Sequence, residues 1–364
     1  MRILLATDAW EPQVNGVVRT LSRTVAECRA MGHEVEVVHP GLFKTMPMPT
    51  YPEIRLALGA YEPMQDLFKE FEPEAIHIST EGPIGLAARR ICQEWKLPFT
   101  TSYHTRFPEY AAARVPMLPV SAGYAYMRWF HSASGRIMVA TPTMRDELAR
   151  RGFRNISPWA RGVDTELFHP RLRQGPDPFE GLARPIFLNV GRVAVEKNIE
   201  AFVALDLPGT RVVVGDGPQL AQLKQKFPQA VFTGAKFGEE LAVHFAHADV
   251  FCFPSLTDTF GLVILEAMAT GTPVAAFPAP GPIDIIPGSG AGSVSQDLKQ
   301  ACLDCLPLDR GVVRAYAERF SWRACAEEFV QNLQPYPEPE KTRFWRRLRR
   351  LTRLRRRSRA ISGA

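Results

Sequence analysis

The sequence contains no long apolar run. Residues 1–8 form a short strand-like segment that soon becomes polar, so they lack the apolar core of about 7–15 residues that a signal peptide has. No apolar stretch approaches the roughly 20 residues of a membrane-spanning helix. We therefore expect a cytoplasmic protein that does not cross a membrane.

Cysteine is scarce, with six residues in 364. Scattered cysteines of this kind are typical of reduced thiols in the cytosol. Only Cys302 and Cys305 have the spacing of a metal-ligand pair, and neither a second CxxC nor paired histidines accompany them. We interpret this pair as structural residues of a helix and predict no metal site.

Acidic residues are absent from residues 341–364, which hold eleven Lys and Arg. The preceding residues hold 33 basic and 38 acidic side chains, a net charge of −5, so the total of +6 describes two different parts. This asymmetry indicates an enzyme body with a separate basic tail.

The length of 364 residues exceeds what one hydrophobic core usually supports, so two domains are expected. Strand-like runs alternate with helical segments such as 17–31 and 85–95. In the first half the strand-like runs are residues 3–6, 35–39, 75–78, 99–102 and 137–140. Strands that alternate with helices predict an α/β fold with a parallel, doubly wound sheet.

A second series of strands follows the Pro- and Gly-containing stretch 170–178. Its runs are residues 186–190, 211–214, 231–232, 250–253 and 274–277. We predict one domain over residues 1–170 and another over 171–320. Because ligands of such sheets bind outside the carboxyl ends of the strands, two facing domains would share one cleft.

Two carboxylates eight residues apart are the strongest candidates for a site. Asp258 follows the apolar run 250–254, and Phe260-Gly261 lies where a strand-to-helix turn exposes N–H groups that attract anions. Glu266 lies inside the predicted helix 262–269, where a carboxylate can accept two hydrogen bonds from a vicinal diol such as ribose. An ordinary βα unit with solvated acids is the alternative.

The loop after the first strand contains Asn15 and Gly16, either of which could cap the following helix. Gly16 would let a ligand approach the backbone. The loop lacks G-x-G-x-x-G, which argues against a nicotinamide dinucleotide. A glycine at a helix start is common, so this feature alone decides little.

His104 follows the predicted strand 99–102 and should project from its end toward the cleft. A neutral imidazole there could hydrogen-bond a sugar hydroxyl or a backbone carbonyl. Thr101, Tyr103 and Arg106 make this loop polar enough to meet a substrate. A histidine with a purely structural role is the alternative.

Arg192 and Lys197 lie directly after the first strand of the second domain. Gly191 permits a sharp turn, and two cations on one loop suit a diphosphate. Glu196 could pair with either cation, so a salt-bridged surface loop is the alternative.

These residues together resemble the retaining glycosyltransferases of family 4, which have two facing Rossmann-like domains of the GT-B type. The resemblance covers nearly all of residues 1–335. It rests on the ordered motifs Asn15-Gly16-Val17, residues 81–85, 102–108 and 161–164, Gly191-Arg192 with Lys197, residues 215–218 and the segment that begins at Asp258. The Thr-Asp-Thr-Phe-Gly and Ser-Tyr-His-Thr sequences are most similar to sulfoquinovosyl and other diacylglycerol glycosyltransferases and to GDP-mannose-dependent α-mannosyltransferases.

The resemblance implies a role for each matched residue. Glu266 would hold the ribose diol, Arg192 and Lys197 would neutralise the diphosphate, and His104 would touch the transferred sugar. The remaining donor contacts would come from Gly16, Val17, Phe260, Gly261 and Leu262. Many members have glutamate in place of Asp258, so the reach of this shorter carboxylate toward the sugar hydroxyls is an open point.

The resemblance also implies a reaction. A hexosyl group (glucosyl, glucuronosyl or mannosyl) would pass from a UDP-sugar or GDP-mannose to an acceptor with retention of configuration, and the donor phosphate would help to remove the acceptor proton. The two cations could replace a metal, so no cofactor is expected. Residues 321–335 resemble the helix that returns to the first domain in this family.

The basic tail indicates where the acceptor is found. In residues 344–355, apolar side chains recur every three or four positions between arginines, which predicts an amphipathic cationic helix. We expect it to bind anionic membrane at the inner face, so that a lipid such as diacylglycerol or a glycolipid is the acceptor. A solvated tail or a nucleic-acid-binding tail is the alternative, and no nucleic-acid partner is expected.

Two other functions are compatible with these motifs. A sugar-nucleotide epimerase can use the same pair of facing domains without any lipid. A non-catalytic module tethered through its tail is the second, although intact Arg192, Lys197 and Glu266 argue against it.

Overall fold

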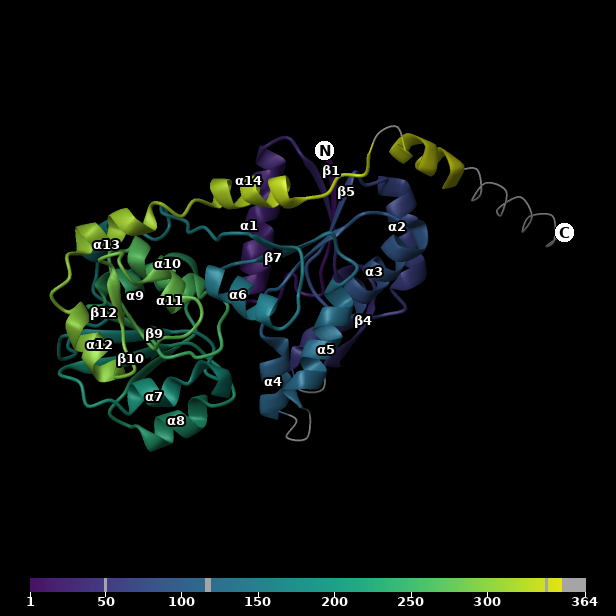
Figure 1. The fold of residues 1–364 in the computed structure, drawn as a ribbon. Helices are drawn as coiled ribbons and strands as arrows, with labels where there is room; N and C mark the ends of the chain where they lie inside the picture. The colour runs from purple at the N-terminus through teal and green to yellow at the C-terminus, as the bar shows by residue number, and fades with distance from the viewer. Residues whose placement is uncertain (49–50, 115–118, 338–339, 349–364) are drawn as a thin grey trace.

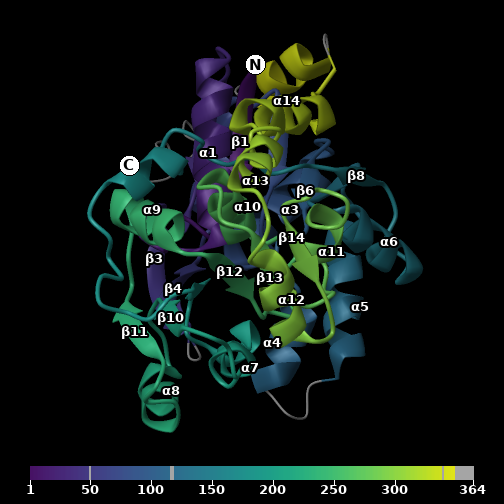
Figure 2. The ribbon, with the colours of Figure 1, turned by 90° about the vertical axis from the view of Figure 1, so that its left-hand side faces the viewer.

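The computed structural model describes residues 1–48, 51–114, 119–337 and 340–348. Two α/β domains lie side by side, and the helix α14 (Trp322–Asn332) runs between them (Figure 1). Viewed from the side of the second domain, the two domains lie one behind the other (Figure 2).

The first domain is built on a six-stranded sheet in which all neighbouring strands are parallel. Its order is β2 (Glu34–Val38), β1 (Arg2–Ala6), β5 (Ala75–Ile78), β6 (Thr100–Ser102), β7 (Arg136–Val139) and β8 (Ile156–Pro158). Its helices are α1 (Gly16–Ala30), α2 (Tyr61–Phe71), α3 (Pro83–Trp95), α4 (Phe107–Arg114), α5 (Val120–His131) and α6 (Pro142–Arg150). The five strands predicted in this half are all present.

The second domain repeats this plan with another parallel sheet of six strands. Its order is β11 (Val231–Gly234), β10 (Thr210–Val214), β9 (Ile186–Val190), β12 (Val250–Phe253), β13 (Val274–Ala276) and β14 (Gly292–Val294). Its helices are α7 (Ile199–Val203), α8 (Leu220–Lys226), α9 (Gly238–His247), α10 (Leu262–Ala269), α11 (Pro282–Ile285), α12 (Leu298–Cys305) and α13 (Arg310–Ala317). A doubly wound α/β fold was predicted for both halves, and both have it.

Four strands were not predicted from the sequence. The antiparallel pair β3 (Lys44–Met48) and β4 (Tyr51–Leu58) forms a separate two-stranded sheet, and β8 and β14 each add an edge strand of three residues. The short 3-10 turns η1 (Pro40–Leu42), η2 (Pro170–Gln174) and η3 (Val195–Lys197) complete the fold.

The helix α14 packs on the first domain. Trp322 and Phe329 are buried in one core with Leu21 and Val25 of α1. The Nε1–H of Trp159 donates to the Cys325 carbonyl at 3.2 Å. A chain segment that follows the second domain thus completes the core of the first.

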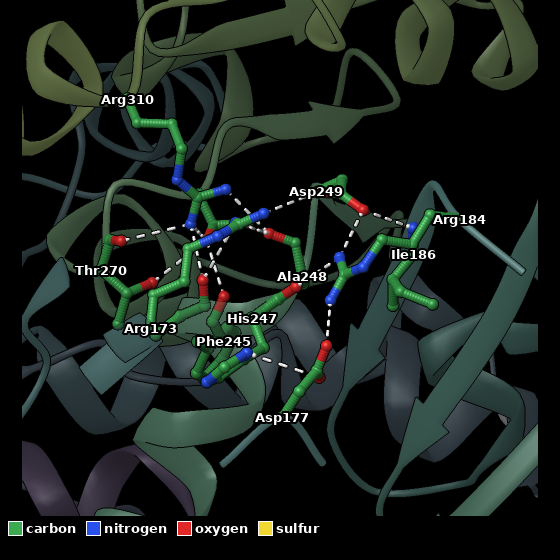
Figure 3. A network of polar contacts seen from close by, with 12 residues as sticks. Arg173, Asp177, Arg184, Ile186, Phe245, His247, Ala248, Asp249, Thr270 and Arg310 are labelled. Carbon is green, nitrogen blue, oxygen red and sulfur yellow. Dashed lines mark hydrogen bonds and ion pairs between the residues drawn. The ribbon is translucent and has the colours of Figure 1, made fainter. Parts of the chain in front are cut away.

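The two domains are connected through residues 159–185, and two arginines of this connection, Arg173 and Arg184, bond to the end of α9 in the second domain, where Arg310 also bonds (Figure 3). Arg173 and Arg184 donate to opposite oxygens of Asp249, at 3.1 and 2.9 Å. Arg310, from the start of α13, donates to the Ala248 and Ala246 carbonyls at 2.8 Å each. These guanidinium groups satisfy carbonyls at the end of α9 that the helix cannot pair by itself.

The tail begins as a helix over residues 340–348 that lies against the first domain. Trp345 is buried, its ring meets Trp95 edge to face at 6.4 Å, and Lys341 pairs with Glu74 at 2.6 Å. The apolar residues of this helix therefore contact the protein, whereas Arg343, Arg346 and Arg347 are exposed. The rest of the predicted tail, 349–364, lies outside the described residues.

Within the described ranges, no helix is both long and apolar enough to span a membrane.

Candidate active site

Each sheet reverses its strand order once, and the candidate residues lie on loops at these two points. In the second sheet the reversal falls between β9 and β12, whose following loops carry Arg192, Lys197 and Asp258. In the first sheet it falls between β1 and β5, and the loop after β1 carries Gly16. Ligands of doubly wound sheets bind at such reversal points. The topology therefore supports a ligand site on these loops.

Asp258 and Lys197 form an ion pair across the reversal point of the second sheet. Nζ of Lys197 lies 2.6 Å from Oδ1 of Asp258. Burial is the largest single effect and lowers the pKa of Lys197, but Asp258, Tyr110 and Glu196 together outweigh it, so the pKa is raised. Oδ2 of Asp258 is buried and has no hydrogen-bond partner in the described structure. This oxygen can accept a hydrogen bond from a ligand hydroxyl without losing one to the protein.

Backbone contacts hold these two loops together. The Asn198 side-chain amide donates to the Pro254 carbonyl at 3.1 Å, and the Ser255 and Thr257 hydroxyls donate to the Glu196 carbonyl at 3.3 and 3.2 Å. The sequence suggested Glu196 as a partner for Lys197, and the structure also pairs Lys197 with Asp258. Arg192 is half-buried on the same loop.

The start of α10 forms the centre of the site. Gly261 has a φ of 86°, which favours glycine, and it precedes the helix without a side-chain cap. Phe260 is buried in the core, so only its backbone can meet a ligand. Leu262 faces the first domain, where its Cδ1 lies 3.8 Å from the position that a Cβ on Gly16 would take, and Val17 belongs to the same apolar cluster. The two domains therefore approach closely at this point.

Glu266 is the fifth residue of α10 and is buried, at 4% exposure. Its Oε1 pairs with Arg19 of α1, 247 residues away in the sequence, and its Oε2 has no hydrogen-bond partner within the described ranges. Burial raises the pKa of Glu266, and Arg19 counteracts this shift. The carboxylate lines a cavity of about 120 Å³ between the domains, together with Arg19, Arg23, Asp164 and Leu241.

His104 is held by its own domain and contacts the other. Its Nε2 lies 2.8 Å from the Ser102 hydroxyl, and its Nδ1 lies 3.4 Å from Nη2 of Arg161. Its carbonyl accepts a hydrogen bond from the Thr259 hydroxyl, at 2.7 Å, directly beside Asp258. Burial, followed by Arg161, His77 and His131, holds the pKa of His104 well below its usual value. The imidazole is therefore neutral at physiological pH.

No three potential metal ligands cluster anywhere in the described part of the chain.

Comparison with known proteins identifies the family of the chain. Residues 14–167 match Glycosyltransferase Family 4, and residues 184–306 match Glycosyl transferases group 1. A GDP-mannose-dependent alpha-mannosyltransferase of Corynebacterium glutamicum is 33% identical over 79% of this chain and 74% of its own length. The chain belongs to the family 4 glycosyltransferases.

That mannosyltransferase represents one of the two groups that the sequence motifs resembled, and two further relatives of this glycosyltransferase represent the other. A sulfoquinovosyl transferase of Arabidopsis thaliana is 30% identical over 88% of this chain and 70% of its own length. An alpha-monoglucosyldiacylglycerol synthase of Streptococcus pneumoniae is 27% identical over 84% and 78%. The enzyme class predicted from the sequence is confirmed.

A solved structure confirms the GT-B fold of the glycosyltransferase. Sucrose-phosphate synthase from Thermosynechococcus elongatus matches with a TM-score of 0.75 over 91% of this chain and 97% of its own, at 21% identity.

Three residues that contact the candidate residues were missed by sequence reasoning. Arg19 contacts Glu266, and both Thr259 and Arg161 contact His104. Arg161 lies in a motif that carried the family resemblance, so a role could have been assigned to it. Arg19 had no such signal, because its partner is in the other domain.

Proposed function

We propose that this glycosyltransferase moves a hexosyl group, with retention of configuration, from a nucleoside diphosphate sugar to a membrane lipid. The observation that carries the proposal is the segment from Asp258 to Glu266. It joins an ion pair, a glycine-started helix and a buried carboxylate, and it touches the first domain at both ends, through Thr259 and Glu266. This arrangement suits a ligand with a diphosphate between a sugar and a ribose.

In the proposed reaction the bond between the anomeric carbon and the diphosphate oxygen breaks. The acceptor oxygen bonds to the same face of that carbon, and its proton passes to the departing phosphate. Lys197 and Arg192 stabilise the negative charge that grows on this phosphate. They therefore lower the free energy of the transition state more than that of the ground state, which lowers the barrier. When the donor binds, the Lys197 ammonium would leave the Asp258 carboxylate and pair with the phosphate instead. The reaction needs no metal in this proposal.

The two carboxylates bind rather than transfer protons. The free Oε2 of Glu266 suits one ribose hydroxyl, and Oε1 becomes available for the other when Arg19 moves away. The free Oδ2 of Asp258 suits a sugar hydroxyl. Because both acceptors are already desolvated, a ligand hydroxyl gains a hydrogen bond at little further cost.

The names of the relatives support the lipid acceptor. One is an alpha-monoglucosyldiacylglycerol synthase, and a 25% identical protein of Mycobacterium tuberculosis is a phosphatidylinositol dimannoside mannosyltransferase. The relatives are transferases, so the epimerase and the non-catalytic module are not favoured.

The decisive experiment offers the purified full-length protein UDP-glucose, UDP-glucuronate, UDP-galactose or GDP-mannose, each with a total lipid extract. We expect one donor to give free nucleoside diphosphate and one new glycolipid by mass spectrometry, with and without EDTA. An altered sugar nucleotide without glycolipid would indicate an epimerase. No product from any donor would refute the proposed reaction.

We further propose that the basic tail holds the enzyme at the inner face of an anionic membrane. Since Trp345 is buried against the first domain, the described part of the tail would act through its exposed arginines and not by inserting apolar residues. Each basic residue near an anionic surface contributes about 1 kcal/mol.

Replacing Arg343, Arg346 and Arg347 together by glutamine is expected to lower partitioning onto phosphatidylglycerol-containing vesicles at least tenfold, by about 1 kcal/mol per charge removed. Sedimentation with vesicles measures this partitioning. The matched triple lysine variant keeps the charge and should bind as the parent does. Equal binding by all three proteins would show that these arginines do not hold the enzyme on the membrane.

A further inference from the structure

A row of polar side chains connects His104 with the interior of the first domain. Ser102 lies between two histidines, with its hydroxyl oxygen 2.8 Å from Nε2 of His104 and 3.1 Å from Nε2 of His77. Nδ1 of His77 lies 2.8 Å from the Thr100 hydroxyl. At the other end of the row, Nη2 of Arg161 lies 3.4 Å from Nδ1 of His104.

Arg161 fixes the direction of the hydrogen bonds in this row. A guanidinium can only donate, and it stays protonated, so the nitrogen that faces it must carry a lone pair. Nδ1 of His104 is therefore the acceptor. In a neutral imidazole the proton must then reside on Nε2, which donates to Ser102.

The remaining groups follow from this assignment. Ser102 accepts from His104, so its own proton can go to Nε2 of His77 at 3.1 Å or to the Ser79 carbonyl at 3.4 Å, and we assign it to the shorter contact. His77 then carries its proton on Nδ1 and donates to Thr100, whose hydroxyl donates to the Ile76 carbonyl at 3.4 Å. With this direction of donation, each group in the row has a hydrogen-bond partner. The opposite direction would place an N–H of His104 against the guanidinium of Arg161.

We propose that Arg161 is a positioning residue that holds His104 as the neutral tautomer with its proton on Nε2. The guanidinium is itself fixed, since Arg161 is buried and donates to the Trp159 and Ala160 carbonyls at 2.6 and 2.9 Å. The His104 ring also contacts the Trp159 ring, with centroids 5.5 Å apart. Side chains locked by packing and by a second layer of hydrogen bonds keep a site in its productive geometry.

The surrounding charges favour the same state. The titratable groups around the imidazole are Arg161, His77 and His131, and each adds to burial in lowering the pKa of His104. Burial also lowers the pKa of Arg161, to about 10, which still leaves it charged at neutral pH. The pKa of His77 is lowered to about 3, so that histidine is neutral as well.

The consequence for recognition rests on the proposed transferase function. The single N–H of His104 is donated inside the protein, so the imidazole has none to give to a substrate. The one lone pair of the ring, on Nδ1, already accepts from Arg161, so a sugar hydroxyl could bond to the ring only by displacing Arg161 from Nδ1, and it would then have to be the donor. A neutral ring also adds no positive charge beside an anomeric carbon that becomes positive in the transition state.

The tautomer can be tested without any substrate. Two-bond ¹H–¹⁵N spectra of the ¹⁵N-histidine-labelled full-length protein distinguish the tautomers, and the His104→Gln variant assigns the signal. From about pH 8 to about pH 5.5, on both sides of the usual histidine pKa of about 6.5, we expect His104 to remain the neutral Nε2–H form. A proton on Nδ1, or a protonated His104 at pH 7, would overturn the proposal whatever reaction the enzyme catalyses.

Two variants separate the charge of Arg161 from its backbone contacts. Arg161→Gln removes the charge and keeps a donor for the carbonyls, whereas Arg161→Lys keeps the charge. We expect mixed tautomers, a higher pKa of His104 and an about tenfold lower kcat at unchanged donor KM in the glutamine variant, and the parental tautomer in the lysine variant. If both variants retain the parental tautomer and pKa of His104, Arg161 has only a structural role and the proposal fails.

Discussion

Lys197→Met is expected to lower kcat about 10³-fold, while donor affinity changes far less. The ammonium already lies at a strand end opposite Asp258, 2.6 Å from its Oδ1, on a loop fastened by Asn198 and Thr257. In the proposed exchange Lys197 moves from Asp258 to the donor phosphate on binding, so its charge is in place before negative charge grows on the departing phosphate. Removing one preorganised group of this kind typically costs about 10²–10³ in rate.

The measurement is the rate of nucleoside diphosphate release at saturating donor and lipid, with donor affinity from calorimetry. Lys226→Met is the matched control, because that lysine forms an exposed pair with Glu200 and lies over the Phe227 ring, away from the candidate site, and should leave the rate unchanged.

Lys197→Met also leaves Asp258 without its cation, and this could weaken the loop. The double variant with Asp258→Asn removes the uncompensated carboxylate. We expect it to restore thermal stability but not kcat. A rise in KM alone, with kcat intact, would show that Lys197 binds the donor equally in the ground and transition states and does not stabilise the leaving group.

The fold was largely predictable because each domain repeats one pattern of buried strand, loop and helix. The central strands, such as 250–253, are short apolar runs buried on both faces. The strands that were missed are of another kind. β8 ends in Pro158, β14 is the three residues Gly292–Val294, and β3 contains Pro47, so these three present no apolar run, whereas β4, which pairs with β3, contains Pro52 and two charged residues.

The site was predictable only within each domain. Loops after parallel strands lie at the carboxyl edge of the sheet, so the prediction placed Lys197 and Asp258 around one cleft, and the structure pairs them. The contacts between domains join residues 155 and 247 positions apart, Thr259 with His104 and Arg19 with Glu266. No local period or spacing encodes such contacts, because they depend on how two completed domains are placed.

The contacts of the basic tail with the first domain could not be predicted from the sequence either. Alternating apolar and basic residues predict an amphipathic helix but not what its apolar side contacts. The structure places that side on the first domain, where Trp345 joins Trp95 in the core.

Glu266→Gln is expected to lower kcat/KM for the nucleotide sugar about 10²–10³-fold. A hydrogen bond to a charged acceptor contributes about 1.5–3 kcal/mol, and a ribose diol makes two of them. The amide of glutamine keeps one acceptor and turns a donor toward the other hydroxyl. Glu318→Gln, on the exposed end of α13, is the matched control and should have no effect.

A donor with 2′-deoxyribose separates this role from a general loss of structure. If Glu266 binds the diol, the parent enzyme should lose much of its activity with the deoxy donor, and the Gln variant should lose little more. Equal losses by both enzymes on removing the hydroxyl would mean that Glu266 does not contact it.

The acid dependence provides a third measurement of the same carboxylate. Because burial raises the pKa of Glu266, it takes up a proton at a higher pH than an ordinary glutamate does. Donor affinity, titrated by calorimetry, should therefore be constant above that raised pKa and fall as the pH drops through it. The Gln variant has no proton to gain at this position, so its weaker affinity should lack this acid limb. Arg19 is the cation that favours the ionised Glu266 carboxylate. Arg19→Gln should therefore raise the pKa of Glu266 further and shift the fall in donor affinity to higher pH.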